Sequence, residues 1–115
     1  MTSRIDKIVF TGQSGRRYDF RLYVWATQFK AVSAVYVVTE RAVEPNAAPT
    51  YRPVFVGGTS DLSQIFKEHP HQDCFDLYYA NTVAVLQEGD EAARAGIEQD
   101  LVASLRPPCN AGEDV

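Results

Sequence analysis

An alternation of apolar and polar residues in the first third of the chain predicts β-strands. Tyr18, Phe20, Leu22 and Val24 recur at every second position, the period that turns one face of a strand toward a core. The segment "GQSG" separates this run from "KIVFTG", and its glycines permit the positive φ angles of a tight turn. We therefore expect an antiparallel hairpin over residues 7–25 that packs on the main sheet.

Apolar runs farther along the chain predict more strands. "SAVYVVTER" is rich in β-branched residues, which favour strands, and "YRPVFVGG" follows it after the link "VEPNAAPT". We expect these two runs to pair antiparallel. Pro53 should lie at a strand start or on an edge strand, because proline cannot donate a backbone hydrogen bond. The run "LYYANTVAVLQE" predicts another strand after "PHQD", which is expected to lack regular structure.

Capping residues and apolar spacing predict helices in the second half of the chain. Thr59 or Ser60 can cap a short helix that begins near Asp61 and ends after His69, where the following proline stops it. A longer helix, "EAARAGIEQDLVASL", should begin after the cap Asp90. Its apolar residues recur at helical spacing and should face the core: Ala93, Ile97, Leu101 and Leu105.

Length and composition favour one small domain. A chain of 115 residues with 45% apolar residues can bury one core, and the elements favour an α+β fold with a small, mainly antiparallel central sheet flanked by helices. No apolar run reaches the about 18 residues of a membrane span, and the first residues lack the apolar segment of a secretory signal. We therefore expect a cytoplasmic protein without membrane contact. Cys74 and Cys109 are too few for a disulfide framework and are expected to be free thiols.

The order of these elements and several residues resemble the GIY-YIG nuclease superfamily. "AVY" at 34–36 stands where that family has its first tripeptide, and "FVG" at 55–57 stands where it has the second. The further marks, in the same order, are Thr59, Leu62, His69, Glu98 and the closing "RPPCN". The resemblance divides the chain into an N-terminal hairpin extension (1–33), a GIY-YIG-like domain (34–110) and a frayed tail (111–115).

The resemblance implies a site made by Tyr36, Phe55, His69, Glu98 and Asn110. Hydrolysis of a phosphodiester requires an activated water, positive charge near the phosphate oxygens and a metal at the leaving oxygen. In the family, the tyrosine that Tyr36 matches lies near the attacking water. The glutamate that Glu98 matches binds the divalent ion, here Mg²⁺ or Mn²⁺, and the asparagine that Asn110 matches helps to hold the site.

Each of these residues also has an ordinary structural interpretation. Tyr36 can be a strand tyrosine whose ring lies in the core and whose hydroxyl reaches the rim. Glu98 can be a solvated helix carboxylate that pairs with Arg94 one turn earlier, a contact worth about 0.3 kcal/mol. Asn110 can be a turn residue after Pro108. The residues alone leave both interpretations open.

Two departures from the family pattern decide the functional prediction. Ile65 stands where the family has a helix arginine, and isoleucine cannot donate the fork of hydrogen bonds that arginine gives to phosphate. By analogy with arginine fingers, such a loss costs on the order of 10³-fold or more in rate. Phe55 stands where the second tripeptide has its tyrosine and so lacks the hydroxyl. We therefore predict a degenerate GIY-YIG-type domain that associates with DNA and has weak or no nuclease activity.

Two other functions stay open. One is an active, divalent-metal-dependent endonuclease that takes its arginine from elsewhere, and the other is a protein-interaction module that uses the hairpin and "CFDLYY" as a contact surface. The net charge of −4 counts against strong binding of nucleic acid unless basic residues form a local stripe. If those residues are scattered instead, the interaction module is favoured. They are Arg16, Arg17, Arg21, Arg41 and Arg52.

A second group of residues offers ligands that suit Zn²⁺. His69, His71 and Cys74 lie close together in sequence, and Cys109 or Asp73 is available as a fourth ligand. Their spacing matches no strong zinc pattern. The preferred interpretation is therefore a loop with two polar histidines and an inert thiol.

Overall fold

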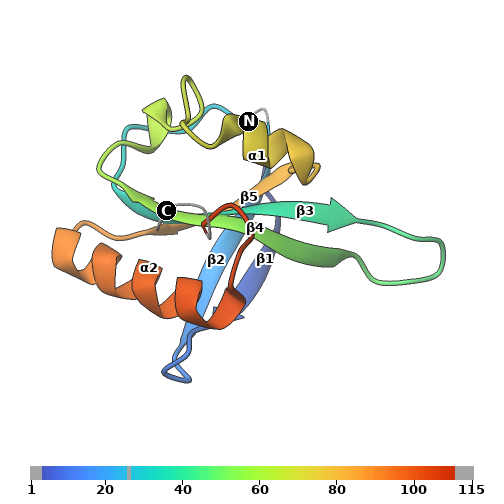
Figure 1. Ribbon diagram of the computed structural model, residues 1–115, viewed down its shortest axis with the longest axis horizontal. Coiled ribbons are helices and arrows are strands. Elements are labelled where there is room, and N and C mark those ends of the chain that lie inside the picture. Colours follow the sequence, from blue (N-terminus) through green and yellow to red (C-terminus); the bar gives the residue numbers. More distant parts are fainter. Residues whose placement is uncertain (1–3, 26, 111–115) are drawn as a thin grey trace.

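The computed structural model describes residues 4–25 and 27–110, so the predicted tail 111–115 lies outside the described residues. The strands are β1 (Arg4–Thr11), β2 (Arg17–Val24), β3 (Ala34–Ala42), β4 (Thr50–Thr59) and β5 (Thr82–Gln87), and the α-helices are α1 (Gln72–Leu77) and α2 (Glu91–Leu105). The strands form one antiparallel sheet in the order β1-β2-β5-β3-β4. Helices α1 and α2 lie on opposite sides of this sheet (Figure 1). The predicted α+β class is confirmed.

The predicted N-terminal hairpin is formed by β1 and β2 and is confirmed. Gly15 in its turn has a φ of 89°, a conformation that glycine adopts readily. The Asp100 carboxylate on α2 holds this turn, because it accepts hydrogen bonds from the Ser14 N–H, the Ser14 hydroxyl and the Tyr18 hydroxyl. The bonds from Ser14, and then the bond from Tyr18, keep the pKa of Asp100 below its ordinary value. Since β2 also pairs with β5, the hairpin and the other strands form one continuous sheet.

The two central apolar runs pair antiparallel, as predicted. β3 lies between β4 and β5, and its residues 34–39 are all buried. β4 is an edge strand, which tolerates Pro53 beside the irregular register between Val38 and Thr39. The far end of the β3–β4 hairpin projects beyond the rest of the molecule (Figure 1).

Apolar side chains cover both faces of the central strands. On the α2 face, Phe20, Leu22 and Val35 pack with Leu101 and their neighbours. On the α1 face, the core includes Tyr36, Phe55, Leu62, Phe75 and Val85. Because β3 and β5 are buried on both faces, their sequences are almost continuously apolar rather than alternating.

Helix α2 begins and ends as predicted. The Asp90 carboxylate accepts a hydrogen bond from the Ala93 N–H at 2.9 Å, which caps the first turn. Arg106 ends the helix with a left-handed φ of 47°. The predicted inward positions are buried or half-buried: Ala93, Ile97, Leu101 and Leu105. None of the helices in the described part of the chain is long and apolar enough to cross a membrane.

The short helix predicted over residues 61–69 is wrong in type and length. Only Leu62–Gln64 form a helical turn, η1, and it is a 3-10 turn. The hydrogen bonds that continue from it, such as the bond from the Ile65 N–H, also span three residues. The cap is Asp61 rather than either of the two residues before it, because its carboxylate accepts hydrogen bonds from both the N–H and the hydroxyl of Ser63. These local bonds favour a tight turn over an α-helix.

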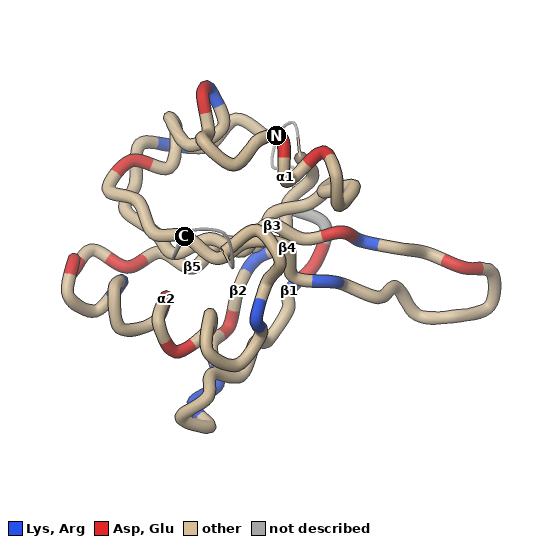
Figure 2. The backbone as a smooth tube through the Cα atoms, viewed as in Figure 1, with Lys and Arg blue, Asp and Glu red and all other residues tan. Residues whose placement is uncertain are grey.

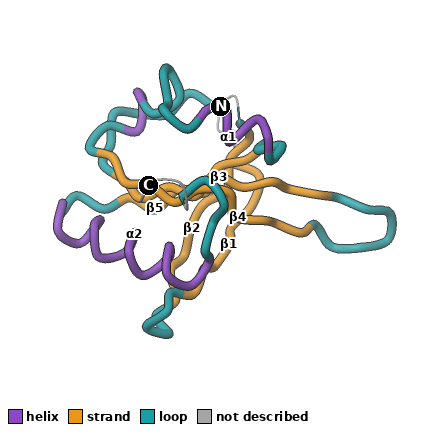
Figure 3. Tube along the Cα trace, viewed as in Figure 1, coloured by secondary structure: helices purple, strands orange, loops and turns teal. Residues whose placement is uncertain are grey.

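Most of the segment after η1 is loop (Figure 3). Its secondary structure differs from the prediction in two further places. Gln72 and Asp73, the second half of "PHQD", form the start of α1, so the prediction that this segment lacks regular structure is wrong for them. Phe75 of α1 is completely buried, so tertiary packing stabilises a helix that local signals do not mark. The strand predicted from Leu77 begins only at Thr82. Tyr79, with a φ of 58°, turns the chain between the two elements.

The prediction of free thiols is wrong, because Cys74 and Cys109 form a disulfide bond. The two cysteines lie 35 residues apart in sequence, and the fold brings their Cα atoms to 5.8 Å from each other. This Cα–Cα distance is within the range that a disulfide requires. The bond joins α1 to the segment that follows α2. Such bonds persist mainly in oxidising compartments, and the cytoplasmic location stays a prediction.

Candidate functional site

Four of the five predicted site residues line one pocket at the β4 edge of the sheet. The pocket has a volume of about 370 Å³ and lies beside the glycine pair of β4. These residues come from four different segments: Tyr36 from β3, Phe55 from β4, His69 from the loop after η1, and Glu98 from α2. The fold therefore assembles a polar site from positions that are distant in sequence.

Tyr36 and His69 form the polar centre of the pocket. The Tyr36 hydroxyl oxygen lies 2.8 Å from His69 Nε2. The ring of Phe55 packs beside both, with ring centroids 6.1 Å from Tyr36 and 5.2 Å from His69. Tyr36 is only 4% exposed, so its ring lies in the core and its hydroxyl points at the histidine.

The hydrogen bonds of His69 determine which ring nitrogen carries the proton. Burial lowers the pKa of His69 to about 4, and His71 contributes to the shift, so the ring is neutral near pH 7. The backbone N–H of His71 donates to His69 Nδ1 at 3.1 Å. Nδ1 is therefore the acceptor nitrogen, and the proton lies on Nε2, which donates to the Tyr36 oxygen.

The glycine pair of β4 leaves room for the polar side chains. A β-carbon on Gly57 would lie 2.6 Å from the hydroxyl oxygen of Tyr36, and one on Gly58 would lie 3.2 Å from a carboxylate oxygen of Glu98. The Glu98 carboxylate therefore lies against the β4 backbone. Glycine is required at 57, where any side chain would collide with Tyr36.

Asn110 supports the site from behind. It is 7% exposed and does not belong to the pocket lining. Its side-chain amide accepts a hydrogen bond from the Val56 N–H at 2.8 Å and donates one to the Val56 carbonyl at 2.9 Å. Cys109 adds a backbone hydrogen bond to Val54. The C-terminal segment thus satisfies the free edge of β4, next to Phe55.

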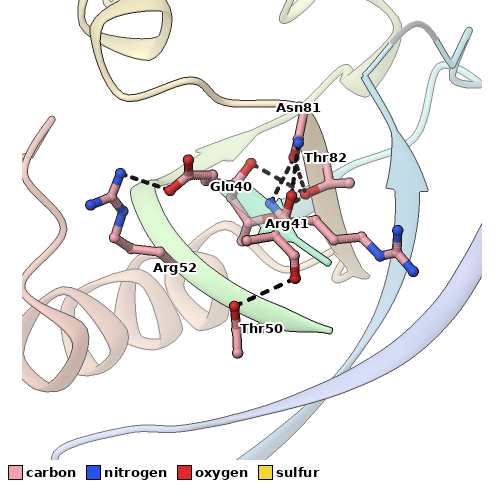
Figure 4. A network of polar contacts seen from close by, with 8 residues as sticks. Glu40, Arg41, Thr50, Arg52, Asn81 and Thr82 are labelled. Atoms are coloured by element: carbon pink, nitrogen blue, oxygen red, sulfur yellow. Dashed lines mark hydrogen bonds and ion pairs between the residues drawn. The ribbon is translucent and has the colours of Figure 1, made fainter. Parts of the chain in front are cut away.

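None of the described residues that line this pocket is a lysine or an arginine. Ile65, which the resemblance places at the position of an arginine, lies in the lining. Arg52 forms an ion pair with Glu40 at 2.7 Å, on the β3–β4 hairpin (Figure 4). Arg94 donates to two backbone carbonyls in the loop before α2, at 3.0 and 3.1 Å. Neither arginine belongs to the pocket lining.

The five arginines considered for a basic stripe do not form one. Lysine and arginine positions are spread over several elements (Figure 2). Arg41 and Arg52 lie on the β3–β4 hairpin, where they pack over the rings of Tyr51 and Tyr78. Arg16 packs over Tyr18 at the other hairpin. Because these arginines are scattered, this observation favours the interaction module over binding of nucleic acid along such a stripe.

The carboxylates of the pocket are suitable ligands for a hard cation. Glu68 and Glu98 both line it, and Mg²⁺ is commonly held by one or two carboxylates together with waters. Among the described residues, no group of three or more His, Cys, Asp or Glu side chains is arranged as a metal site. Both cysteine sulfurs considered as zinc ligands are in the disulfide.

The polar lining residues that were not predicted for the site include Gln64, Glu68 and His71. His71 packs on Phe55 with the ring centroids 4.7 Å apart. The sequence contains a signal for this arrangement in "EHPH", where a proline between two histidines turns the chain and keeps the loop compact.

No family model, curated protein or solved structure that was compared with this chain matches it.

Proposed function

We propose that this chain is a degenerate GIY-YIG-type domain that associates with nucleic acid and has weak or no nuclease activity. The observation that carries the proposal is the composition of the pocket at the β4 edge. It contains Tyr36, His69 and Glu98, which suit water activation and metal binding, but no described lysine or arginine that could contact a phosphate.

The arrangement of elements supports the proposal. From β3 onward, the chain forms two antiparallel strands, a helical segment, a third strand and a long helix, the order that the resemblance requires. The residues at the five family positions gather around β4, four in the pocket and Asn110 behind it. Arg94, the partner of Glu98 in the ordinary interpretation, donates to the backbone carbonyls of Glu88 and Gly89.

The residues of the pocket divide the chemistry between them. His69 donates to the Tyr36 oxygen and so fixes the position of the phenol group that would orient an attacking water. Glu98 and Glu68 would hold a divalent ion, Mg²⁺ or Mn²⁺, which supplies Lewis-acid stabilisation of the phosphate when bound. Ile65 offers no charge to the non-bridging oxygens. The catalytic contribution that the pocket lacks is therefore electrostatic stabilisation of the transition state rather than activation of water.

A second candidate is an active, metal-dependent endonuclease. The observation that favours it is the presence of two carboxylates in the same pocket. Two carboxylates can hold metal ions, whose positive charge would offset part of the charge of the missing arginine. The third candidate, a protein-interaction module, is favoured by the exposure of Leu77 (70%) and Tyr79 (74%) at the end of α1.

The test is cleavage of plasmid and branched DNA with Mg²⁺ or Mn²⁺, by the wild type and Glu98→Ala. The proposal expects trace cleavage or none in the wild type, together with measurable DNA binding. Robust cleavage that disappears in Glu98→Ala would establish the active endonuclease instead. A folded protein that neither cleaves nor binds DNA would favour the interaction module. Glu91→Ala, at an exposed carboxylate on the same helix outside the pocket, is the matched control.

A further inference from the structure

The face of the β1–β2 hairpin that points away from α2 borders a second, larger groove. Its volume is about 1360 Å³, and segment 27–32 forms one of its walls. Phe20 and Leu22 point to the α2 face, so the alternating residues Asp19, Arg21 and Tyr23 point to the groove. This volume exceeds the about 300–1,000 Å³ of typical small-molecule pockets, which favours an extended ligand.

The groove is positively charged although the chain is negatively charged. Its lining contains Lys7, Arg21 and Lys30 as cations and Asp19 as the one acid, a net charge of +2 from +3 and −1, whereas the chain carries −4. Lys7 and Arg21 are direct partners across β1 and β2, and like charges in this position destabilise a sheet. The ion pair found among the described residues joins Arg52 to Glu40. Lys7, Arg21 and Lys30 therefore form no ion pair with a described carboxylate. An anionic ligand would relieve this repulsion.

Two aromatic rings lie in the wall of the same groove. Tyr23 and Phe29 contact each other edge to face, with centroids 5.3 Å apart and an angle of 87°, and both are half-buried. Each ring therefore retains exposed surface next to the cations. Aromatic rings beside basic side chains are the combination that binds single strands, because bases stack on the rings while the cations contact phosphates.

We propose that this groove binds a single strand of nucleic acid, with phosphates on Lys7, Arg21 and Lys30 and a base on Tyr23 or Phe29. The inference rests on the nucleic-acid association proposed above, but it uses a surface that shares no residue with the β4-edge pocket. A duplex or an acidic peptide is a different ligand, and both are outcomes of the test.

The test is fluorescence anisotropy with labelled oligo-dT and oligo-rU of about 16 nucleotides, in buffer with EDTA. The double variant Lys7→Glu/Lys30→Glu should weaken binding at least about tenfold, whereas Lys67→Glu, which changes the only other lysine and lies outside the groove, should bind like the wild type. Three phosphate contacts predict an about 20-fold loss of affinity between about 50 and 200 mM salt, since each contact contributes about 0.7 to the slope. Both lysines are exposed, and circular dichroism checks the fold, with the single variants as a second measurement.

The competing outcomes separate the inferences. Equal loss in Lys67→Glu, equal affinity for duplex DNA, or no binding of either oligonucleotide by folded protein would overturn the groove proposal. Binding of poly-glutamate, but not of oligonucleotides, would assign the groove to an acidic protein segment instead. Glu91→Ala, at an exposed carboxylate on α2 outside both the groove and the β4-edge pocket, should leave oligonucleotide binding unchanged. If the oligonucleotides do not bind the groove while plasmid DNA is still bound, the groove proposal fails alone and the proposed function stands.

Discussion

Tyr36 and Glu98 reach the same pocket from opposite faces of the sheet. Tyr36 projects from β3 into the apolar layer on the α1 side, whereas Glu98 belongs to α2 on the other side. They meet because β4 presents Gly57 and Gly58 between them, with no side chain in the way. A strand edge without side chains is therefore the feature that brings the two groups together.

Gly57→Ala should displace Tyr36 and destabilise the protein by about 1–3 kcal/mol. The new β-carbon would lie 2.6 Å from the tyrosine hydroxyl and 2.8 Å from the Phe55 ring. Both rings are buried, so the new β-carbon must displace groups that are packed in the core. Urea unfolding measures the loss. Gly96→Ala is the control, since a β-carbon there meets nothing within 4 Å and alanine favours a helix. Equal midpoints for Gly57→Ala and wild type would contradict the close approach.

His69 should make stability depend on pH. Its pKa in the folded protein is lowered from 6.5 to about 4 by burial and, second, by His71. The fold favours the neutral ring, so this contribution is fully present above pH 6.5 and is lost as the pH falls from 6.5 toward 4. We expect the free energy of unfolding of the wild type to fall more steeply in this window than that of His69→Gln.

The protonation of His69 can also be followed directly by NMR. The ring signals should titrate with a midpoint near 4, and the proton of the neutral ring should lie on Nε2, because Nδ1 accepts from the backbone of His71. The variant His71→Gln should keep most of the shift, since burial is the larger cause. A titration midpoint near 6.5 in the wild type would contradict the lowered pKa of His69.

The parts of the fold that the sequence predicts correctly are those marked by local signals. The alternation in β2 and the cap at Asp90 each act within a few residues, and both elements form where expected. The secondary structure predicted for residues 61–81 is wrong in detail, because contacts with residues distant in sequence determine the structure of this segment. Phe75 is anchored in a core built from three strands and η1, and Cys74 is bonded to a residue 35 positions away. No local pattern records either contact.

The candidate site was predicted in part for the same reason. The resemblance predicted Tyr36, His69 and Glu98 as site residues, and these three line one pocket; their functional role stays a prediction. It did not identify Glu68 or His71, because their place in the lining depends on the path of the loop after η1. The role of Asn110 follows from two hydrogen bonds to Val56 that only the three-dimensional structure reveals.

Reduction of the disulfide should lower the free energy of unfolding by about 3–4 kcal/mol, because the bond closes a loop of 35 residues in the unfolded chain. The measurement is urea unfolding with and without a reductant. Cys74→Ser/Cys109→Ser should be equally destabilised and insensitive to the reductant. Two reactive thiols in the native, unreduced protein would contradict the bond. So would identical unfolding curves in the two buffers.

Ile65→Arg should raise trace cleavage by up to about 10³-fold, because a guanidinium at this position supplies the fork of hydrogen bonds that the pocket lacks. Ile65 is half-buried at the pocket. An arginine side chain at this position can therefore extend from the apolar layer to the pocket opening. The measurement is the cleavage rate of branched DNA with Mg²⁺, beside the double variant Ile65→Arg/Glu98→Ala, which should be inactive.

Ile65→Lys is the matched control for this gain, since it adds the same charge without the planar fork. A larger gain for arginine than for lysine indicates bidentate contact with a phosphate. Equal gains would indicate only attraction of the DNA. If a folded Ile65→Arg protein shows no gain while it still binds DNA, the pocket at the β4 edge lacks more than a positive charge, and the relation of this site to phosphodiester cleavage is wrong.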